Sequence, residues 1–130
     1  MSRKKLTVKA VTEFLDNCFE AEGSFPVCCL TGITSLHYTP VSGYVLDADN
    51  AMELTTGGSF CLNVAPAKKA IAVEDLRKKL DGVPGELTFV VLDEDSRKDE
   101  GVILVRPVIS MTRTKTKIVF VCGAFIKEKK

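Results

Sequence analysis

Several features that identify common protein classes are missing from this sequence. No stretch of about eighteen consecutive apolar residues occurs, which is the length that a membrane-spanning helix needs. No apolar run of signal-peptide length follows the basic residues after Met1, so we expect a cytoplasmic protein. The formal net charge is only +1, and no overall electrostatic field attracts nucleic acid or a membrane. Any partner must therefore be recognised by a local surface.

The cysteines and the one histidine do not form a recognisable metal or disulfide pattern. The five cysteines are odd in number and include no Cys-x-x-Cys pair, whereas structural zinc sites show closely spaced ligands. The acidic segment 93–101 lacks a glycine at the sixth position, which an EF-hand loop requires. Because 45% of the residues are hydrophobic, a chain of this length can form a stable core without a metal ion or a disulfide bond. We expect free buried thiols, no metal, no cofactor and one compact domain over residues 1–130.

The clearest local pattern is an amphipathic helix followed by a stop signal and a buried strand. Val73, Leu76 and Leu80 fall at i, i+3 and i+7, so they share one face of a helix. Gly82 can adopt the left-handed conformation that ends a helix, and Pro84 cannot continue one. A strand is predicted to follow at residues 87–92.

A similar order of elements can be traced in the first half of the chain. The matching positions are 8, 11 and 15 with 73, 76 and 80; 27–30 with 89–92; 40–41 with 107–108; and 60–65 with 119–124. This predicts an α+β fold of two tandem helix-strand-strand-strand copies, at about residues 6–65 and 71–125, with an antiparallel sheet covered by two helices. The alternative is two unrelated helix-plus-sheet halves.

The pattern of Val73, Leu76 and Leu80, then Pro84, a strand through residues 90–91 and later residues 117–121, resembles a family of known modules. These are small helix-then-strands modules encoded by phages and prophages, and they have no assigned function. The resemblance covers most of the second expected copy and the first more loosely. It implies a bacterial or phage setting, with the host-cell cytoplasm as the location of a phage-encoded chain, and a non-catalytic role, and it supplies no site residues.

The loop around His37 offers the best catalytic arrangement. A Cys28 or Cys29 nucleophile would use His37 as its base, with Asp47 or Asp49 orienting the imidazole. However, neighbouring strand residues point to opposite faces, and both cysteines align with apolar residues of the second copy. No phosphate-binding glycine loop or hydrolase motif is present. We therefore expect a binding protein, with a small enzyme using this loop as the alternative.

Two segments are candidates for binding. The hydroxyl-rich residues 31–40 contain the one histidine, and residues 112–117 alternate threonine with cations. Strand alternation would place these cations on one face, unless a hairpin turn breaks the row. Such a row either protects a solvated edge or contacts an acidic protein or a small anionic ligand. No aromatic residue alternates with the cations, so nucleic acid is not expected. The candidate binding residues are Thr31, Gly32, His37, Tyr38, Arg113, Lys115 and Lys117.

These patterns favour a non-enzymatic binding or accessory protein, which contacts a host protein or sequesters a small ligand. A homodimer is a further expectation. The predicted strand at residues 59–64 carries no charge that would protect an exposed edge, so a symmetric homodimer would form through exposed strands or through the helix faces.

Overall fold

The computed structural model describes residues 6–18, 20–30, 38–47, 59–64, 69–94 and 96–129. Strands predominate in these ranges. The helices are α1 (Val8–Asp16) and α3 (Val73–Leu80), with the short 3-10 helices η1 (Glu20–Ser24) and η2 (Lys98–Glu100). The strands are β1 (Val27–Leu30), β2 (Thr39–Asp47), β3 (Ser59–Val64), β4 (Thr88–Asp93), β5 (Ile103–Arg113), β6 (Ile118–Cys122) and β7 (Lys127–Lys129).

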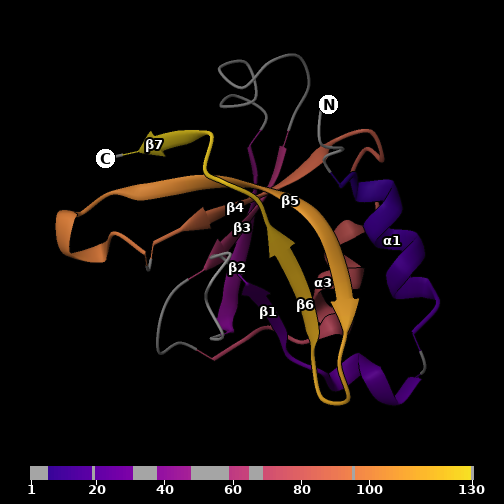
Figure 1. The fold of residues 1–130 in the computed structure, drawn as a ribbon. Coiled ribbons are helices and arrows are strands. Elements are labelled where there is room, and N and C mark those ends of the chain that lie inside the picture. The colour runs from indigo at the N-terminus through magenta and orange to yellow at the C-terminus, as the bar shows by residue number, and fades with distance from the viewer. Residues whose placement is uncertain are drawn as a thin grey trace.

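Strands β1 to β6 form a closed barrel, with the two α-helices on its outside (Figure 1). Antiparallel pairings join β1 to β2, β2 to β3, β4 to β5 and β5 to β6. Parallel pairings join β3 to β4 and β1 to β6, and these two complete the ring. The short strand β7 pairs antiparallel with the first residues of β5.

The predicted fold class is therefore wrong. The strands do not form an antiparallel sheet built from two tandem copies and covered by two helices. Both parallel pairings connect the first half of the chain to the second, so all six strands belong to one barrel. Closure pairs backbone groups that would lie unpaired at the edges of an open sheet, and this removes the need for helices to cover it.

The segments before the two helices also join the halves. The N–H of Leu6 donates to the carbonyl of Val108 at 2.9 Å, and the Leu6 carbonyl accepts from the N–H of Phe89 at 2.9 Å. Ile71 makes the corresponding pair of bonds to β2 and β1 of the first half. The segment that precedes each helix is therefore hydrogen-bonded to the other half of the chain.

The premise of the predicted homodimer is also wrong. Strand β3 is not an exposed edge, because β2 pairs with it on one side and β4 on the other. The homodimer was expected from the sequence, and pairing of β3 on both sides removes this reason for it.

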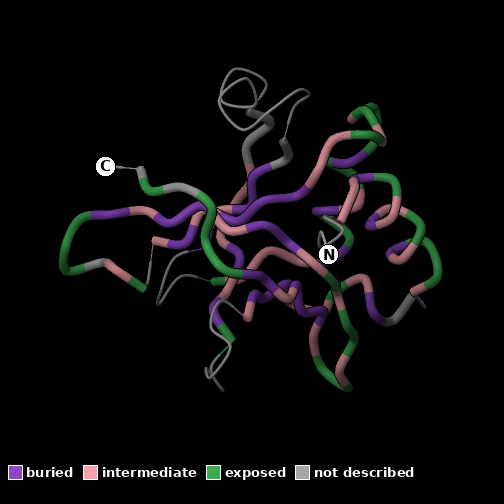
Figure 2. The backbone as a smooth tube through the Cα atoms, turned by 45° about the horizontal axis from the view of Figure 1, so that its top comes forward, coloured by how far each residue is buried: buried purple, intermediate pink, exposed green. Residues whose placement is uncertain are grey.

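The core fills the barrel and continues beneath the helices, as the buried segments in Figure 2 show. At its centre, the rings of Phe89 on β4 and Phe120 on β6 stack with centroids 5.5 Å apart. The predicted helix faces are confirmed, because Leu15 of α1 and Leu76 and Leu80 of α3 are all buried. The helix stop is confirmed as well, since Gly82 has φ +83°. No helix among the described residues is long and apolar enough to cross a membrane.

Candidate functional site

The hairpin turn that the sequence allowed is present between β5 and β6, and it breaks up the row of cations. Arg113 is the last residue of β5 and pairs in register with Ile118, the first residue of β6. The hydroxyl of Thr114 accepts hydrogen bonds from the N–H of Thr116 at 3.3 Å and of Lys117 at 3.0 Å, which closes the turn. The cations consequently lie at the end of one strand, in the turn and before the next strand. They do not line a single strand face.

Arg113 makes an ion pair that ties the hairpin to η1. Its Nη1 lies 2.9 Å from one carboxylate oxygen of Glu22 and 3.1 Å from the other. The Glu22 side chain is 11% exposed and the Arg113 side chain 43% exposed, so the acid faces inward and the guanidinium faces solvent. The two residues are 91 positions apart, and no local pattern in the sequence indicated that they would meet.

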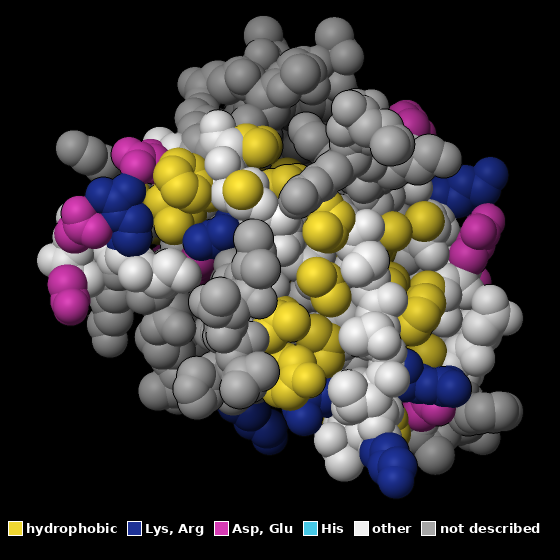
Figure 3. Space-filling view, viewed as in Figure 1, with side chains coloured by type: hydrophobic (Ala, Val, Ile, Leu, Met, Phe, Trp, Pro, Cys, Tyr) yellow, Lys and Arg dark blue, Asp and Glu magenta, His cyan; other side chains and the backbone are white. Residues whose placement is uncertain are grey.

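Two hollows that are open to solvent share Arg113 as a wall. The first, of about 410 Å³, lies between α1 and β5 and is lined by Phe14, Asn17, Cys18, Met111, Thr112 and Arg113. The second, of about 420 Å³, is lined by Glu22, Phe25, Arg113, Thr114 and Lys115. We call these two hollows, with the Arg113–Glu22 pair between them, the hairpin surface. At the lower edge of Figure 3, cationic and acidic side chains gather over the hairpin, beside a strip of hydrophobic side chains.

Part of the lining of the first hollow is apolar, and the neutral thiol of Cys18 contributes to it. Burial, followed by a hydrogen bond to Glu22, raises the pKa of Cys18 to about 11. The thiol also lies 3.7 Å from the carbonyl oxygen of Phe14. At neutral pH the side chain of Cys18 is therefore a small hydrophobic group beside Phe14 and Met111.

Of the predicted binding residues, Tyr38 and Lys117 are brought together beside the hairpin. The Lys117 ammonium nitrogen lies 4.7 Å from the centroid of the Tyr38 ring, within the range of a cation–π contact. Arg113 and Lys115 line the hairpin surface. Thr31, Gly32 and His37 lie outside the described residues. Sequence reasoning missed Glu22, Phe14 and Met111, which only the tertiary structure brings to the cations.

The two candidate nucleophiles lie in surroundings that favour the neutral thiol. Cys29 is fully buried, and burial, with a hydrogen bond to Cys122, holds its pKa well above the usual value. Cys28 is 7% exposed, and burial raises its pKa against a smaller opposing effect of Lys117. Since catalysis requires the thiolate, neither position resembles an activated cysteine. Their proposed base, His37, lies outside the described residues.

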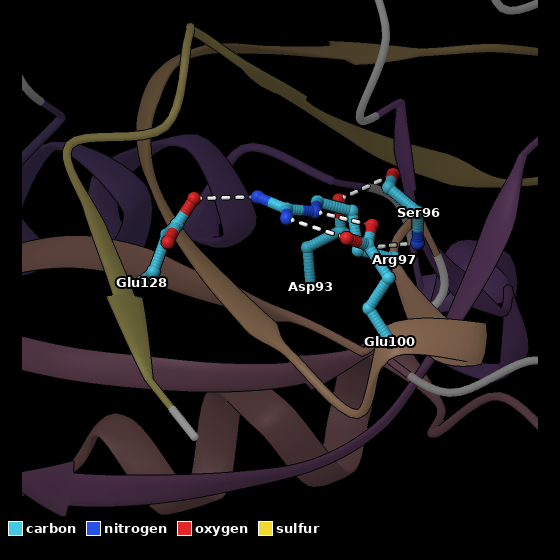
Figure 4. A network of polar contacts seen from close by, with 5 residues as sticks. All are labelled: Asp93, Ser96, Arg97, Glu100 and Glu128. Carbon is cyan, nitrogen blue, oxygen red and sulfur yellow. Dashed lines mark hydrogen bonds and ion pairs between the residues drawn. The ribbon is translucent and has the colours of Figure 1, made fainter.

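The acidic connection between β4 and β5 is organised by arginines (Figure 4). Nε of Arg97 lies 2.7 Å from the carboxylate of Glu100, and Nη1 of Arg97 bonds to Glu128 on β7. Nε of Arg106 lies 2.8 Å from the buried carboxylate of Asp93. In the part of the chain that the structure describes, no group of three or more His, Cys, Asp or Glu residues could hold a metal ion.

A third hollow, of about 470 Å³, lies beside α3 and is lined by Tyr44, Ile71, Asp75, Lys78 and Lys79. Although it is the largest of the three, its chemistry favours ligand binding less. The Lys79 ammonium nitrogen already lies 5.6 Å from the centroid of the Tyr44 ring, and Asp75 opposes the charge of the lysines. This hollow provides matched positions for control variants.

Comparison with protein-family models, with curated proteins and with solved structures found no match for this chain. The phage or prophage setting stays a prediction. Among the described residues, the hairpin surface combines an ion pair with two hollows that are open to solvent.

Proposed function

We propose that this chain is a non-enzymatic binding protein that uses the hairpin surface to contact an acidic partner. The observation that carries the proposal is the contact between Arg113 and Glu22. A half-exposed guanidinium already holds a carboxylate there, with an open hollow on either side. Arginine binds carboxylates in this way through charge-assisted hydrogen bonds.

The form of the hollows supports a protein partner over a sequestered small ligand. Small-molecule sites enclose most of the ligand in a concave, mostly apolar pocket. Both hollows here are open to solvent and lie side by side along the hairpin, which suits a segment of chain laid across them. The setting that we propose is the cytoplasm of a bacterial host, where a phage accessory protein would meet a host protein.

The alternative function is a small enzyme that uses Cys28 or Cys29 with His37. It is favoured less because the pKa values of both thiols are raised. Any turnover by the purified chain that disappeared in a folded Cys28→Ser or His37→Ala variant would support this alternative over binding.

The binding proposal is tested with two charge reversals of the same size. Lys115→Glu alters the hairpin surface, and Lys78→Glu alters an exposed lysine of α3. Each tagged variant is purified from its source cells, and its complexes are weighed by native mass spectrometry. We expect the wild-type chain and Lys78→Glu to retain one common partner and Lys115→Glu to lose it. Equal retention by both variants would show that the hairpin surface is not the binding surface.

A further inference from the structure

We infer that the hairpin surface takes an acidic peptide segment of its partner, and that Glu22 is an internal competitor for Arg113. The inference rests on the proposed function and deepens it, since it names the chemistry of the bound segment. A carboxylate of the peptide contacts Arg113, and an apolar side chain beside it enters the hollow next to Phe14.

Glu22 occupies the position on Arg113 that a partner carboxylate would take. Its two oxygens lie 2.9 and 3.1 Å from Nη1 of Arg113, which are ordinary distances for a charge-assisted hydrogen bond. Because η1 supplies Glu22 and the hairpin supplies Arg113, the pair bridges two separate elements. The Arg113 side chain is 43% exposed, so a partner carboxylate reaches the guanidinium from solvent and competes with Glu22 for its hydrogen bonds.

The first hollow determines which side chain of the peptide can lie next to its carboxylate. Phe14 and Met111 line it together with the neutral thiol of Cys18. Methionine is flexible and polarisable, so its side chain adapts to apolar groups of different shapes. A ligand with an aliphatic side chain next to a carboxylate therefore fits both the hollow and Arg113.

Charge complementarity extends the site along the hairpin. Lys115 lines the second hollow, and Lys117 follows it in the turn, whereas Glu22 is the one acid among the described residues that line the two hollows. These cations attract an acidic segment and speed its association. Lys117 lies over the Tyr38 ring, so this ring is not presented for stacking on a base. An acidic peptide is accordingly favoured over a nucleic acid.

The test uses the purified full chain and a synthetic peptide in which one leucine is flanked by aspartates and glutamates. Binding is measured by calorimetry at low ionic strength, because exposed charge pairs are screened by salt. Arg113→Gln should weaken binding at least about tenfold, which is about 1.4 kcal/mol. Glu22→Gln should strengthen binding by about the same factor, because it removes the competing charge. The Gln side chain keeps the size and shape of the glutamate.

Matched controls separate the site from the overall charge. Lys78→Gln and Glu86→Gln make the same charge changes at exposed positions away from the hairpin, and should change affinity by less than about twofold. Arg113→Lys keeps the positive charge and replaces Arg113→Gln in the experiment if that variant does not fold. Arg113→Lys should bind the peptide more weakly than the wild type, because lysine lacks the planar fork of arginine. Replacing the peptide leucine by glycine should weaken binding to the wild type but not to Phe14→Ala.

Four results would overturn the inference, and the last of them is the absence of any peptide binding by the wild type. The first is equal peptide binding by the wild type and Arg113→Gln, and the second is weaker binding by Glu22→Gln. The third is tighter binding of inorganic phosphate, single-stranded DNA or anionic vesicles than of the peptide, with the same dependence on Arg113. If the wild type binds no peptide but keeps a partner that Lys115→Glu loses, the inference fails and the proposed function stands. If Lys115→Glu keeps every partner, the proposed function fails.

Discussion

The side chain of Asp93 is fully buried, and arginine and serine partners stabilise its charge. One oxygen accepts from the N–H of Ser96 at 3.0 Å, and the other accepts from the Ser96 hydroxyl at 2.6 Å and from Nε of Arg106 at 2.8 Å. Asp93→Ala would leave Arg106, whose side chain is 13% exposed, without this carboxylate. Removing one partner of such a buried pair costs about 3 to 5 kcal/mol. We expect urea denaturation to show a loss of this size.

Arg97 provides the control for this prediction, because it lies in the same network but at the surface (Figure 4). Its partners Glu100 and Glu128 have side chains that are 57% and 42% exposed, so solvent screens both ion pairs. Arg97→Ala should therefore destabilise the chain far less than Asp93→Ala. Equal losses in the two variants would show that burial does not set the strength of these pairs.

Leu80 and Leu15 allow a test of how much single buried side chains contribute to stability. They are 3% and 5% exposed and belong to one hydrophobic core, although they come from different helices. Replacing either leucine by alanine removes buried methyl groups and leaves a cavity, which costs about 2 to 5 kcal/mol. Chemical denaturation of Leu80→Ala and Leu15→Ala measures this cost. A loss below about 0.5 kcal/mol in either variant would contradict the assigned helix faces.

The thiol of Cys18 predicts a dependence of stability on pH. Its pKa is raised from 9.0 to about 11, so the folded chain binds this proton more tightly than the unfolded chain. That contribution to stability is fully present below about pH 9 and is lost as the pH rises towards 11. We therefore expect the free energy of unfolding of the wild type, measured with reductant present, to fall more steeply over this range than that of Cys18→Ser. Parallel curves for the two proteins would contradict the raised pKa.

Among whole elements, α3 depends on the glycine that ends it. Gly82 has φ +83°, a left-handed conformation in which an alanine is strained by about 1 to 2 kcal/mol. Gly82→Ala should lower the free energy of unfolding by about that amount. Gly43 in β2 is the control, because a Cβ there would meet nothing within 4 Å and φ lies outside the left-handed region. If Gly43→Ala is as damaging as Gly82→Ala, the explanation from φ is wrong.

The elements that the sequence predicted correctly are those with local signals. The spacing of Leu76 and Leu80 reflects a helical repeat within a few residues, and Gly82 marks its end by its own backbone freedom. The strand through Val90 was predicted from a continuous apolar run, which reflects burial on both faces of the barrel wall. Such signals require no knowledge of the pairing partner.

What the sequence did not reveal is how these elements pair. The parallel pairing of β1 with β6 places Cys28 opposite Val119, and nothing in either strand specifies the other. The contact of Arg113 with Glu22 has the same non-local origin, so the cations were identified as candidates but their acidic partner was missed. The hairpin turn itself, closed by the Thr114 hydroxyl, was anticipated from the sequence because it depends on neighbouring residues.

At the scale of the whole molecule, closure of the barrel changes the expectation for self-association. Within the described residues, β7 ends the order of strands in the sheet, and its sequence is Lys-Glu-Lys. Antiparallel pairing of two copies through Glu128 would place like charges opposite each other at every position, which is destabilising. We therefore expect light scattering at about 100 μM to give the mass of one chain. The mass of two chains would show that another surface makes a dimer.

The same closure predicts that neither half of the chain folds alone. The parallel pairings β3–β4 and β1–β6 both join the halves, and Leu6 and Ile71 each donate and accept hydrogen bonds across the division. A half by itself would leave these backbone groups unpaired and the core residues of the barrel exposed. Fragments 1–66 and 67–130 should each give the narrow amide dispersion of an unfolded chain in NMR spectra. Mixed in equal amounts, they should recover the spectrum of the intact protein, because the division interrupts none of the helices and strands that the structure describes. Native-like dispersion from either fragment alone would mean that the halves are independent folding units, and that the barrel only brings them together.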